Sequence, residues 1–167
     1  MEIGNIQIGH DVEVDSTSSL NNVIIGNHVR IAKYCSVYGH KDHLLEIGEF
    51  SYIGMFSVLN GYSNKVTIGK YVSIAQNVNM MTDSGPNASS LMQRFYPITK
   101  GPIIIEDHVW IGAGVIIMPN VVIGRCSIIA ANSFLNCNVK AYSLFGGNPA
   151  RHIKSLDSIK DYEDKEI

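Results

Sequence analysis

The chain has 167 residues and a formal net charge of −2, so it is long enough for one domain with its own core. Lys and Arg are scattered and the pI is about 6.3, a balance that argues against a nucleic-acid partner. No apolar stretch reaches the roughly 20 residues of a membrane span, and the N-terminus lacks an export-signal pattern. The cysteines Cys35, Cys126 and Cys137 lack metal-ligand spacing. We therefore expect reduced thiols, a cytoplasmic location and no metal.

An aliphatic residue recurs every six positions along most of the chain, often followed by Gly or Ala. A period of six fits a short strand plus a turn, and three such units complete one triangular coil whose apolar residues stack on those of the next coil. The repeat predicts an all-β fold, a left-handed parallel β-helix over residues 1–150. In chain order its inward positions are Ile8, Val14, Leu20, Ile25, Ile31, Val37, Ile47, Ile53, Leu59, Ile68, Ile74, Met80, Ile105, Ile111, Ile117, Ile123, Ile129 and Leu135.

The repeat is interrupted three times. The spacing is ten residues from Val37 to Ile47, nine from Leu59 to Ile68 and 25 from Met80 to Ile105, instead of six. Each insertion follows the third unit of its coil, so all three loops should leave the prism at one corner. With coils about 4.8 Å apart, the first loop should lie about 10 Å below the root of the third. Long loops on a rigid scaffold commonly carry function, so the loop at about 81–103 is the main candidate.

The end of the chain loses the repeat. Residues 151–167 are charged, with Ile153, Leu156 and Ile159 on or near one face of a helix. The pattern predicts a helical C-terminal tail.

The segment from Val66 to Lys154 resembles hexapeptide-repeat acetyltransferases, in particular the galactoside, maltose and xenobiotic O-acetyltransferase branch. It contains VWIGAG at 109–114, MPNVVIG at 118–124 and GGNPA at 146–150. The resemblance implies a homotrimer with active sites in the clefts between neighbouring prisms. It also implies acetyl-CoA as co-substrate and a sugar or polysaccharide precursor as acceptor, acetylated on a hydroxyl or an amine.

The resemblance also suggests which residues hold the cofactor. Trp110, Ala113 and Ala131 would lie near the thioester and pantetheine, where small side chains leave room for a ligand on the backbone. The positions that reach the phosphates or adenine would be Asn136, Cys137, Arg151 and Lys154. Family members often have a Thr-Lys pair where this chain has Asn136-Cys137, which leaves Arg151 and Lys154 to supply positive charge.

The family's catalytic histidine is replaced in this chain. In such enzymes a loop His deprotonates the acceptor hydroxyl for attack on the thioester, whereas the corresponding position here is Gly85. Three explanations remain open: Asp83 acts as base or orients the acceptor, His40 or His43 reaches the cleft from two coils below, or the acceptor is an amine that needs less activation. We name Asp83 and His40 as candidate catalytic residues. The candidate acceptor-binding residues are His43, Met55, Ser63 and Asn87.

Two other functions compete with acetyl transfer. A catalytically lapsed β-helix that serves as a binding or assembly module is consistent with the missing histidine. A carbonic anhydrase on this fold would need three His ligands for Zn²⁺ on neighbouring coils, a spacing that we do not find. We expect structural roles for His10, His28 and His108 at turn positions of the repeat.

Overall fold

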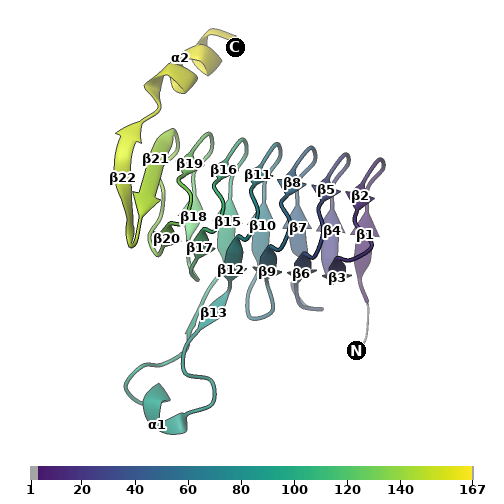
Figure 1. Ribbon diagram of the computed structural model, residues 1–167, viewed down its shortest axis with the longest axis vertical. Helices are drawn as coiled ribbons and strands as arrows, with labels where there is room; N and C mark the ends of the chain where they lie inside the picture. The colour runs from purple at the N-terminus through teal and green to yellow at the C-terminus, as the bar shows by residue number, and fades with distance from the viewer. Residues whose placement is uncertain (1–3, 167) are drawn as a thin grey trace.

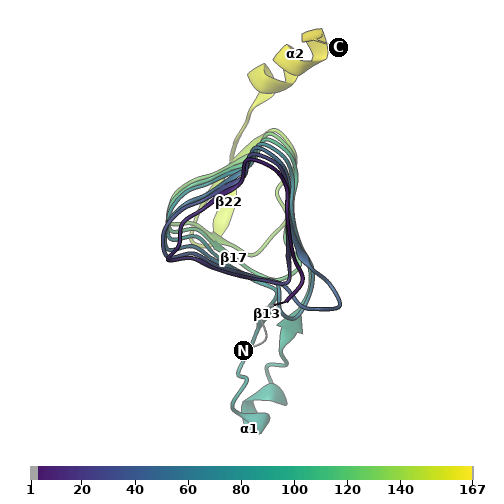
Figure 2. The same cartoon turned by 90° about the vertical axis from the view of Figure 1, so that its right-hand side faces the viewer.

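The structure is a computed structural model that describes residues 4–166, with side chains through residue 162. The chain winds into a β-solenoid whose coils superimpose as a triangle when viewed along the axis (Figure 2). Each side of the triangle is a sheet whose strands come from successive coils and pair in parallel (Figure 1). The predicted left-handed parallel β-helix is confirmed.

Three large sheets and one short hairpin contain all the described strands. Sheet A contains β1 (Ile6–Ile8), β4 (Val23–Ile25), β7 (Leu45–Ile47), β10 (Val66–Ile68), β15 (Ile103–Ile105) and β18 (Val122–Ile123). Sheet B contains β2 (Glu13–Val14), β5 (Arg30–Ile31), β8 (Tyr52–Ile53), β11 (Ser73–Ile74), β16 (Trp110–Ile111), β19 (Ile128–Ile129), β21 (Ser143–Gly147) and β22 (Ala150–Ser155). Sheet C contains β3 (Ser19–Asn21), β6 (Ser36–Tyr38), β9 (Val58–Asn60), β12 (Asn79–Met81), β17 (Ile116–Ile117) and β20 (Phe134–Leu135).

The core is the column of inward residues that the repeat predicts. Ile47, Ile68 and Ile105 are in register on consecutive strands of sheet A, and all three are buried. Sheets B and C contribute equivalent columns, so each coil buries its apolar side chains between those of its two neighbours. Burying one such side chain is worth about 1.5–3 kcal/mol, which explains why stacked coils, rather than single ones, are stable.

The corners of the prism are tight. At Gly112, between sheets B and C, a Cβ would lie 2.6 Å from the amide nitrogen of Ala131 on the next coil. At the A–B corner the turn residues have positive φ although they are not glycine, and their rings stack: His28 on Phe50, Phe50 on Tyr71, and Tyr71 on His108. Stacking between coils compensates part of the strain of this backbone conformation.

All three insertions leave the prism at the C–A corner, as predicted. They follow β6, β9 and β12, which are neighbours in sheet C, with Tyr38 paired to Asn60 and Asn60 to Met81. The third insertion starts with an antiparallel pair, β13 (Asp83–Ser84) and β14 (Thr99–Lys100), and carries the short helix α1 (Ser90–Gln93) at its far end. Figures 1 and 2 show it projecting away from the prism.

The C-terminal tail is only partly helical. Helix α2 covers Asp157–Glu166, but Ala150–Ser155 form strand β22, so the helical prediction is wrong for residues 151–155. The reason is the open edge of the last coil: β22 folds back antiparallel onto β21 and occupies backbone groups that would otherwise be unpaired. Neither described helix is long and apolar enough to cross a membrane.

Candidate functional site

Asp83 lies at the loop corner in a site built by the second and third loops. Its Oδ2 accepts a 2.7 Å hydrogen bond from the Ser63 hydroxyl, which comes from the loop of the coil below. The backbone amides of Ser63 and Asn64 both donate to the buried Thr82 hydroxyl at 3.2 Å, and that hydroxyl donates to the Asn60 carbonyl. Thr82 therefore fixes the Ser63 loop beneath the Asp83 carboxylate.

Tyr38, the last residue of β6, contributes a phenol hydroxyl at the same corner. Burial raises the pKa of the Tyr38 hydroxyl above its ordinary value, and the negative charge of Asp83 raises it further. The hydroxyl therefore stays protonated at neutral pH and can donate a hydrogen bond. The corner thus combines a fixed carboxylate, the hydroxyls of Ser63, Thr82 and Tyr38, and a partly buried aromatic ring, a set suited to a polar or cationic acceptor group.

No side chain fits at Gly85. A Cβ placed there would lie 2.8 Å from the Cα of Ile98, on the returning arm of the same loop. A contact this short with backbone requires the loop to move. Gly85 therefore allows the two arms of the loop to approach each other closely.

His40 and His43 share the first loop and face each other. Their backbones form an antiparallel bridge and their ring centroids are 5.1 Å apart. The Nδ1 of His40 lies 3.2 Å from the Asp42 carboxylate, and its ring meets the edge of Tyr62 on the next coil. Among the described side chains, the contacts of His40 run to Asp42, His43 and Tyr62 rather than to Asp83. His40 thus lies at the same corner as Asp83, but the second loop, which carries Ser63, lies between them.

A groove lies beside this corner. It has a volume of about 540 Å³ and runs over β3 and β6 on the outer face of sheet C. Tyr38 and Tyr62 line it together with polar side chains that include Asn21 and Ser36. Grooves of this size accept ligands as large as a nucleotide, with aromatic rings for stacking and a few polar groups for orientation.

Met55 and Asn87, two predicted acceptor residues, lie apart from Ser63 and Asp83. Met55 is at the B–C corner, where its carbonyl accepts from the Asn77 amide of the next coil, and it lines a separate hollow of about 660 Å³. Asn87 is in the projecting loop, where its carbonyl accepts from the Gln93 side chain. Within one chain the structure brings Ser63 to Asp83 and leaves these two elsewhere.

Ala113 and Ala131, predicted to lie along the cofactor, are at equivalent positions of the B–C corner. The Asn132 amide donates to the Ala113 carbonyl at 2.8 Å, so the two turns stack directly. Trp110, on the adjoining strand of sheet B, is 55% exposed and points outward. Small corner residues beside an exposed indole leave an open strip of backbone on this side of the prism.

Lys154 lies at the end of an outward row on sheet B. In register across the strands, Trp110 pairs with Ile128, Ile128 with Leu144, and Leu144 with Lys154. Three strand spacings of about 4.8 Å separate the indole from the lysine, roughly 14 Å in all. In this row the side chains of Ile128 and Leu144 lie between the Trp110 indole and the Lys154 ammonium group.

Arg151 is also on β22, paired with Gly146, and is exposed. Asn136 follows β20 and is exposed at the C–A side of the last coil. The structure therefore gathers Trp110, Ala113, Ala131, Arg151 and Lys154 along sheet B and the B–C corner, which we call the sheet B wall. Asn136 lies outside it.

Sequence reasoning missed Tyr38, Thr82 and Tyr62. Tyr38 is the last residue of β6, immediately before the first insertion, and Thr82 follows β12 at the start of the third. Each residue that borders an insertion lies at the root of the loop corner. That position in the repeat is the signal that could have identified Tyr38 and Thr82.

Comparisons with known proteins agree with this architecture. Residues 102–137 match the family model described as bacterial transferase hexapeptide (six repeats). The chain is 30% identical to the hexapeptide-repeat containing acetyltransferase of Vibrio cholerae, with a TM-score of 0.64 over 90% of this chain and 73% of that one. The chain belongs to the hexapeptide-repeat acetyltransferase family. It is an acyltransferase that uses an acyl-CoA donor.

Two further relatives cover nearly the whole chain. One is a dTDP-4-amino-4,6-dideoxy-D-glucose acyltransferase of Escherichia coli, 28% identical over 91% of this chain and 83% of that protein. The other is AntD, an N-acyltransferase from Bacillus cereus whose structure holds dTDP and 3-hydroxybutyryl-CoA. It is 26% identical, with a TM-score of 0.78 over 94% of this chain and 87% of that one.

Proposed function

We propose that this protein transfers an acyl group from acyl-CoA to the amine of a nucleotide-linked amino sugar. The observation that carries the proposal is the pairing of Asp83 with Ser63 at a corner where Gly85 leaves no room for an imidazole. A hydroxyl acceptor needs a base to raise its nucleophilicity, whereas a neutral amine is already nucleophilic. The likeness to acyltransferases of a dTDP-linked amino sugar supports the same acceptor class.

In the proposed reaction the amine nitrogen attacks the thioester carbonyl, forming the C–N bond, and the C–S bond then breaks to release CoA. Asp83 accepts a hydrogen bond from the amine and takes the proton that the nitrogen loses, which passes on to the departing thiolate. Ser63 keeps the carboxylate oriented through its 2.7 Å hydrogen bond. The Tyr38 hydroxyl is a donor available to the sugar.

The groove over β3 and β6 suits the nucleotide part of the acceptor. The exposed ring of Tyr62 provides a stacking surface for a base, and Tyr38 is the groove residue whose hydroxyl the Asp83 charge affects. Stacking of a base on an aromatic ring is worth about 1–3 kcal/mol. We therefore assign the base to the Tyr62 side and the amino sugar to the Tyr38 side.

The donor would lie along the sheet B wall. Trp110, Ala113 and Ala131 would face the pantetheine arm of the CoA. Arg151 and Lys154 would face its phosphates. These residues line sheet B and the B–C corner, whereas Asp83 lies at the C–A corner, at the other end of sheet C. A complete site therefore needs the wall of one chain to meet the loop corner of another.

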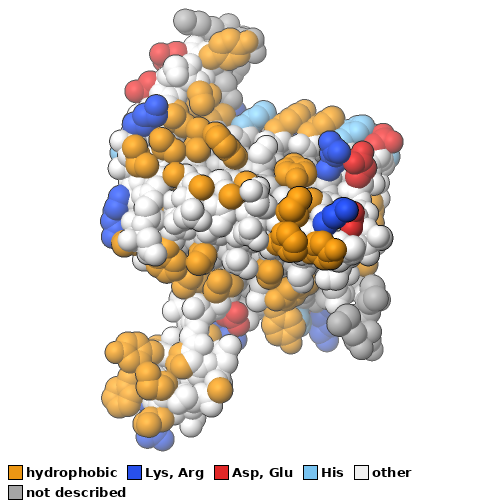
Figure 3. Space-filling model, in the orientation of Figure 1, with side chains coloured by type: hydrophobic (Ala, Val, Ile, Leu, Met, Phe, Trp, Pro, Cys, Tyr) orange, Lys and Arg blue, Asp and Glu red, His pale blue; other side chains and the backbone are white. Residues whose placement is uncertain are grey.

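We accordingly propose a homotrimer. The projecting loop ends in exposed apolar side chains, Leu91, Met92, Phe95 and Tyr96, visible as a cluster in Figure 3. Such a patch is expected to be covered by another surface. Light scattering that shows a stable monomer at micromolar concentration would contradict this assembly and leave the site without its second wall.

The test is an acceptor assay with purified protein, acetyl-CoA and longer acyl-CoA donors, and free thiol release as readout. A dTDP-4-amino-sugar and the matched dTDP-sugar with a hydroxyl at the same carbon are the two acceptors. We expect thiol release with the amine and at least about tenfold less with the hydroxyl. Equal or higher activity on the hydroxyl would contradict the proposal, and saturable acyl-CoA binding without transfer to either acceptor would indicate a binding module.

A further inference from the structure

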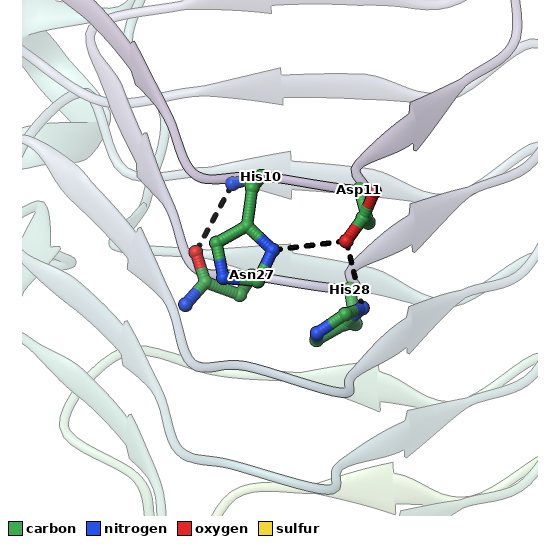
Figure 4. Close-up of polar contacts among 4 residues, drawn as sticks. All are labelled: His10, Asp11, Asn27 and His28. Atoms are coloured by element: carbon green, nitrogen blue, oxygen red, sulfur yellow. Dashed lines mark hydrogen bonds and ion pairs between the residues drawn. The ribbon is translucent and has the colours of Figure 1, made fainter.

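Three metal-ligating side chains converge at the A–B corner of the first two coils, a different corner of the prism from the C–A corner that holds Asp83 and Ser63. His10 and Asp11 come from the turn after β1, and His28 from the equivalent turn after β4 (Figure 4). One carboxylate oxygen, Oδ2 of Asp11, lies 3.0 Å from Nδ1 of His10 and 3.7 Å from Nδ1 of His28. One ligand atom from each residue lies within 4.8 Å of the others.

These separations are close to those of ligands that share one ion. Zn²⁺ binds imidazole nitrogen and carboxylate oxygen at about 2.0–2.2 Å in tetrahedral geometry, so neighbouring ligand atoms are about 3.3 Å apart. The two distances to Asp11 bracket that value. Only the two imidazoles need to approach each other, a movement that rotation of the exposed His10 ring can supply while His28 stays on its stacking column.

The surrounding structure holds the ligands in place. The Asn27 side chain accepts a 3.1 Å hydrogen bond from the His10 amide, and the His28 amide donates to the His10 carbonyl. The His28 ring is stacked on Phe50 at 4.6 Å, with 16° between the planes, and Phe50 is stacked on Tyr71. This column limits rotation of the imidazole that belongs to the second coil. Such support of ligands is a regular feature of metal sites.

We propose that His10, Asp11 and His28 form a site for a divalent transition-metal ion of the Zn²⁺ class, which links the first coil to the second. Two imidazoles and one carboxylate are donors that favour Zn²⁺, Ni²⁺ and Cu²⁺ over Mg²⁺ or Ca²⁺. Each imidazole binds through the Nδ1 lone pair, with its hydrogen on Nε2. The exposed position leaves the remaining coordination sites to water.

The location gives the ion a structural role. β1, β2 and β3 are edge strands of their sheets, and Ile6 and Ile8 are exposed. An end coil has one stacking neighbour instead of two and opens more readily than internal coils. An ion held by both coils stabilises the folded form by mass action, because the ligands are brought together only in that form. The site requires no acyl transfer and does not depend on the proposed acceptor.

The test is titration of the untagged protein with Zn²⁺ by calorimetry and with Co²⁺ by visible absorption, which reports the coordination directly. His28→Asn and Asp11→Asn remove one ligand each while keeping a residue type that tolerates the positive φ of both positions. His108→Asn is the matched control, since it has φ 58° in the same column but lies beyond Tyr71. We expect saturable one-to-one binding that each ligand variant weakens at least about tenfold and the control leaves unchanged.

Hydrogen exchange supplies a second measurement that does not involve the ligand spectrum. Saturating Zn²⁺ should slow exchange in β1, β2 and β3 of the wild type and leave β15 to β20 unchanged. In His28→Asn the effect should disappear. Binding of equal strength in the wild type and in both ligand variants, or a Zn²⁺ effect that is not confined to the first coils, would overturn the proposal.

Discussion

The sheet B wall and the loop corner are built on the same hexapeptide repeat but differ in how the sequence uses it. Along the wall the repeat is uninterrupted from Ile105 to Leu135, and small residues at the corner keep the backbone accessible. At the loop corner three insertions of different length carry the polar groups, among them Ser63 and Asp83. We propose the wall as the site of the acyl-CoA donor and the corner as the site of the acceptor. On this proposal the donor and acceptor sites use different parts of the repeat, so each can change without the other.

The largest expected effect is at the loop corner. Asp83→Asn keeps the shape but removes the negative charge and the proton-accepting oxygen, so we expect kcat to fall by about 10²–10⁴-fold. Acyl-CoA affinity should not change, because Asp83 is proposed to contact the acceptor amine, whereas Trp110, Arg151 and Lys154 hold the CoA. Steady-state kinetics and calorimetry measure the two quantities, with Ser84→Ala as control. A loss of less than tenfold in kcat would remove Asp83 from the mechanism.

The next effect is at the wall. Replacing Arg151 and Lys154 together with Ala should raise the dissociation constant of acyl-CoA by at least about tenfold, since charge-assisted hydrogen bonds contribute about 1.5–3 kcal/mol each and exposed ones lie at the low end. Lys160→Ala, on helix α2, is the control. Unchanged affinity in calorimetry would move the phosphate site away from β22.

Thr82→Val tests how the corner is built. The variant leaves the amides of Ser63 and Asn64 without their acceptor, and a lost partner in a buried site costs about 1–3 kcal/mol. Urea denaturation should show that loss, and kcat should fall because Ser63 no longer holds Asp83. Thr67→Val, on β10, should cost less. Equal stability of the two variants would mean that the Thr82 hydroxyl does not organise the loops.

Gly85→Ala tests the close approach of the loop arms. The added Cβ meets the Ile98 backbone, and relief by loop movement costs about 1–3 kcal/mol locally. We expect faster hydrogen exchange in β13 and β14 and a modest fall in kcat, with no change in the exchange of the coils. A Gly85→His variant that gains hydroxyl acylation would show instead that the loop accepts the family arrangement.

The smallest effect concerns Tyr38. Its pKa is raised in the folded protein, so its contribution to stability is fully present below its unfolded pKa of about 10 and is lost as the pH rises through the higher folded value. Between about pH 9 and about pH 11 the wild type should lose more stability in urea than Tyr38→Phe does. Equal losses would mean that neither burial nor the Asp83 charge raises the pKa of Tyr38.

The elements that the sequence predicted are those fixed by local, repeated interactions. The six-residue period predicted the strands and the inward residues, and the three insertions in it predicted loops at one corner. The tail was predicted less well, because Arg151 to Ser155 have no repeat of their own and become a strand through the open edge of β21. Met55 and Ser63 were grouped by resemblance, but the turns put them at different corners.

The sequence by itself determined the coil, the common corner of the insertions and the absence of a usable side chain at Gly85. Counting six-residue units along the chain tells in which sheet and in which coil a residue lies, so its position along the prism axis follows from the sequence. Only the tertiary structure decided that Thr82 holds Ser63 against Asp83, and that His28 meets His10 and Asp11 from the next coil. These contacts join residues about one coil apart and depend on side-chain conformation, loop shape and turn geometry. All three are set by packing between coils, so the six-residue pattern of the sequence does not predict them.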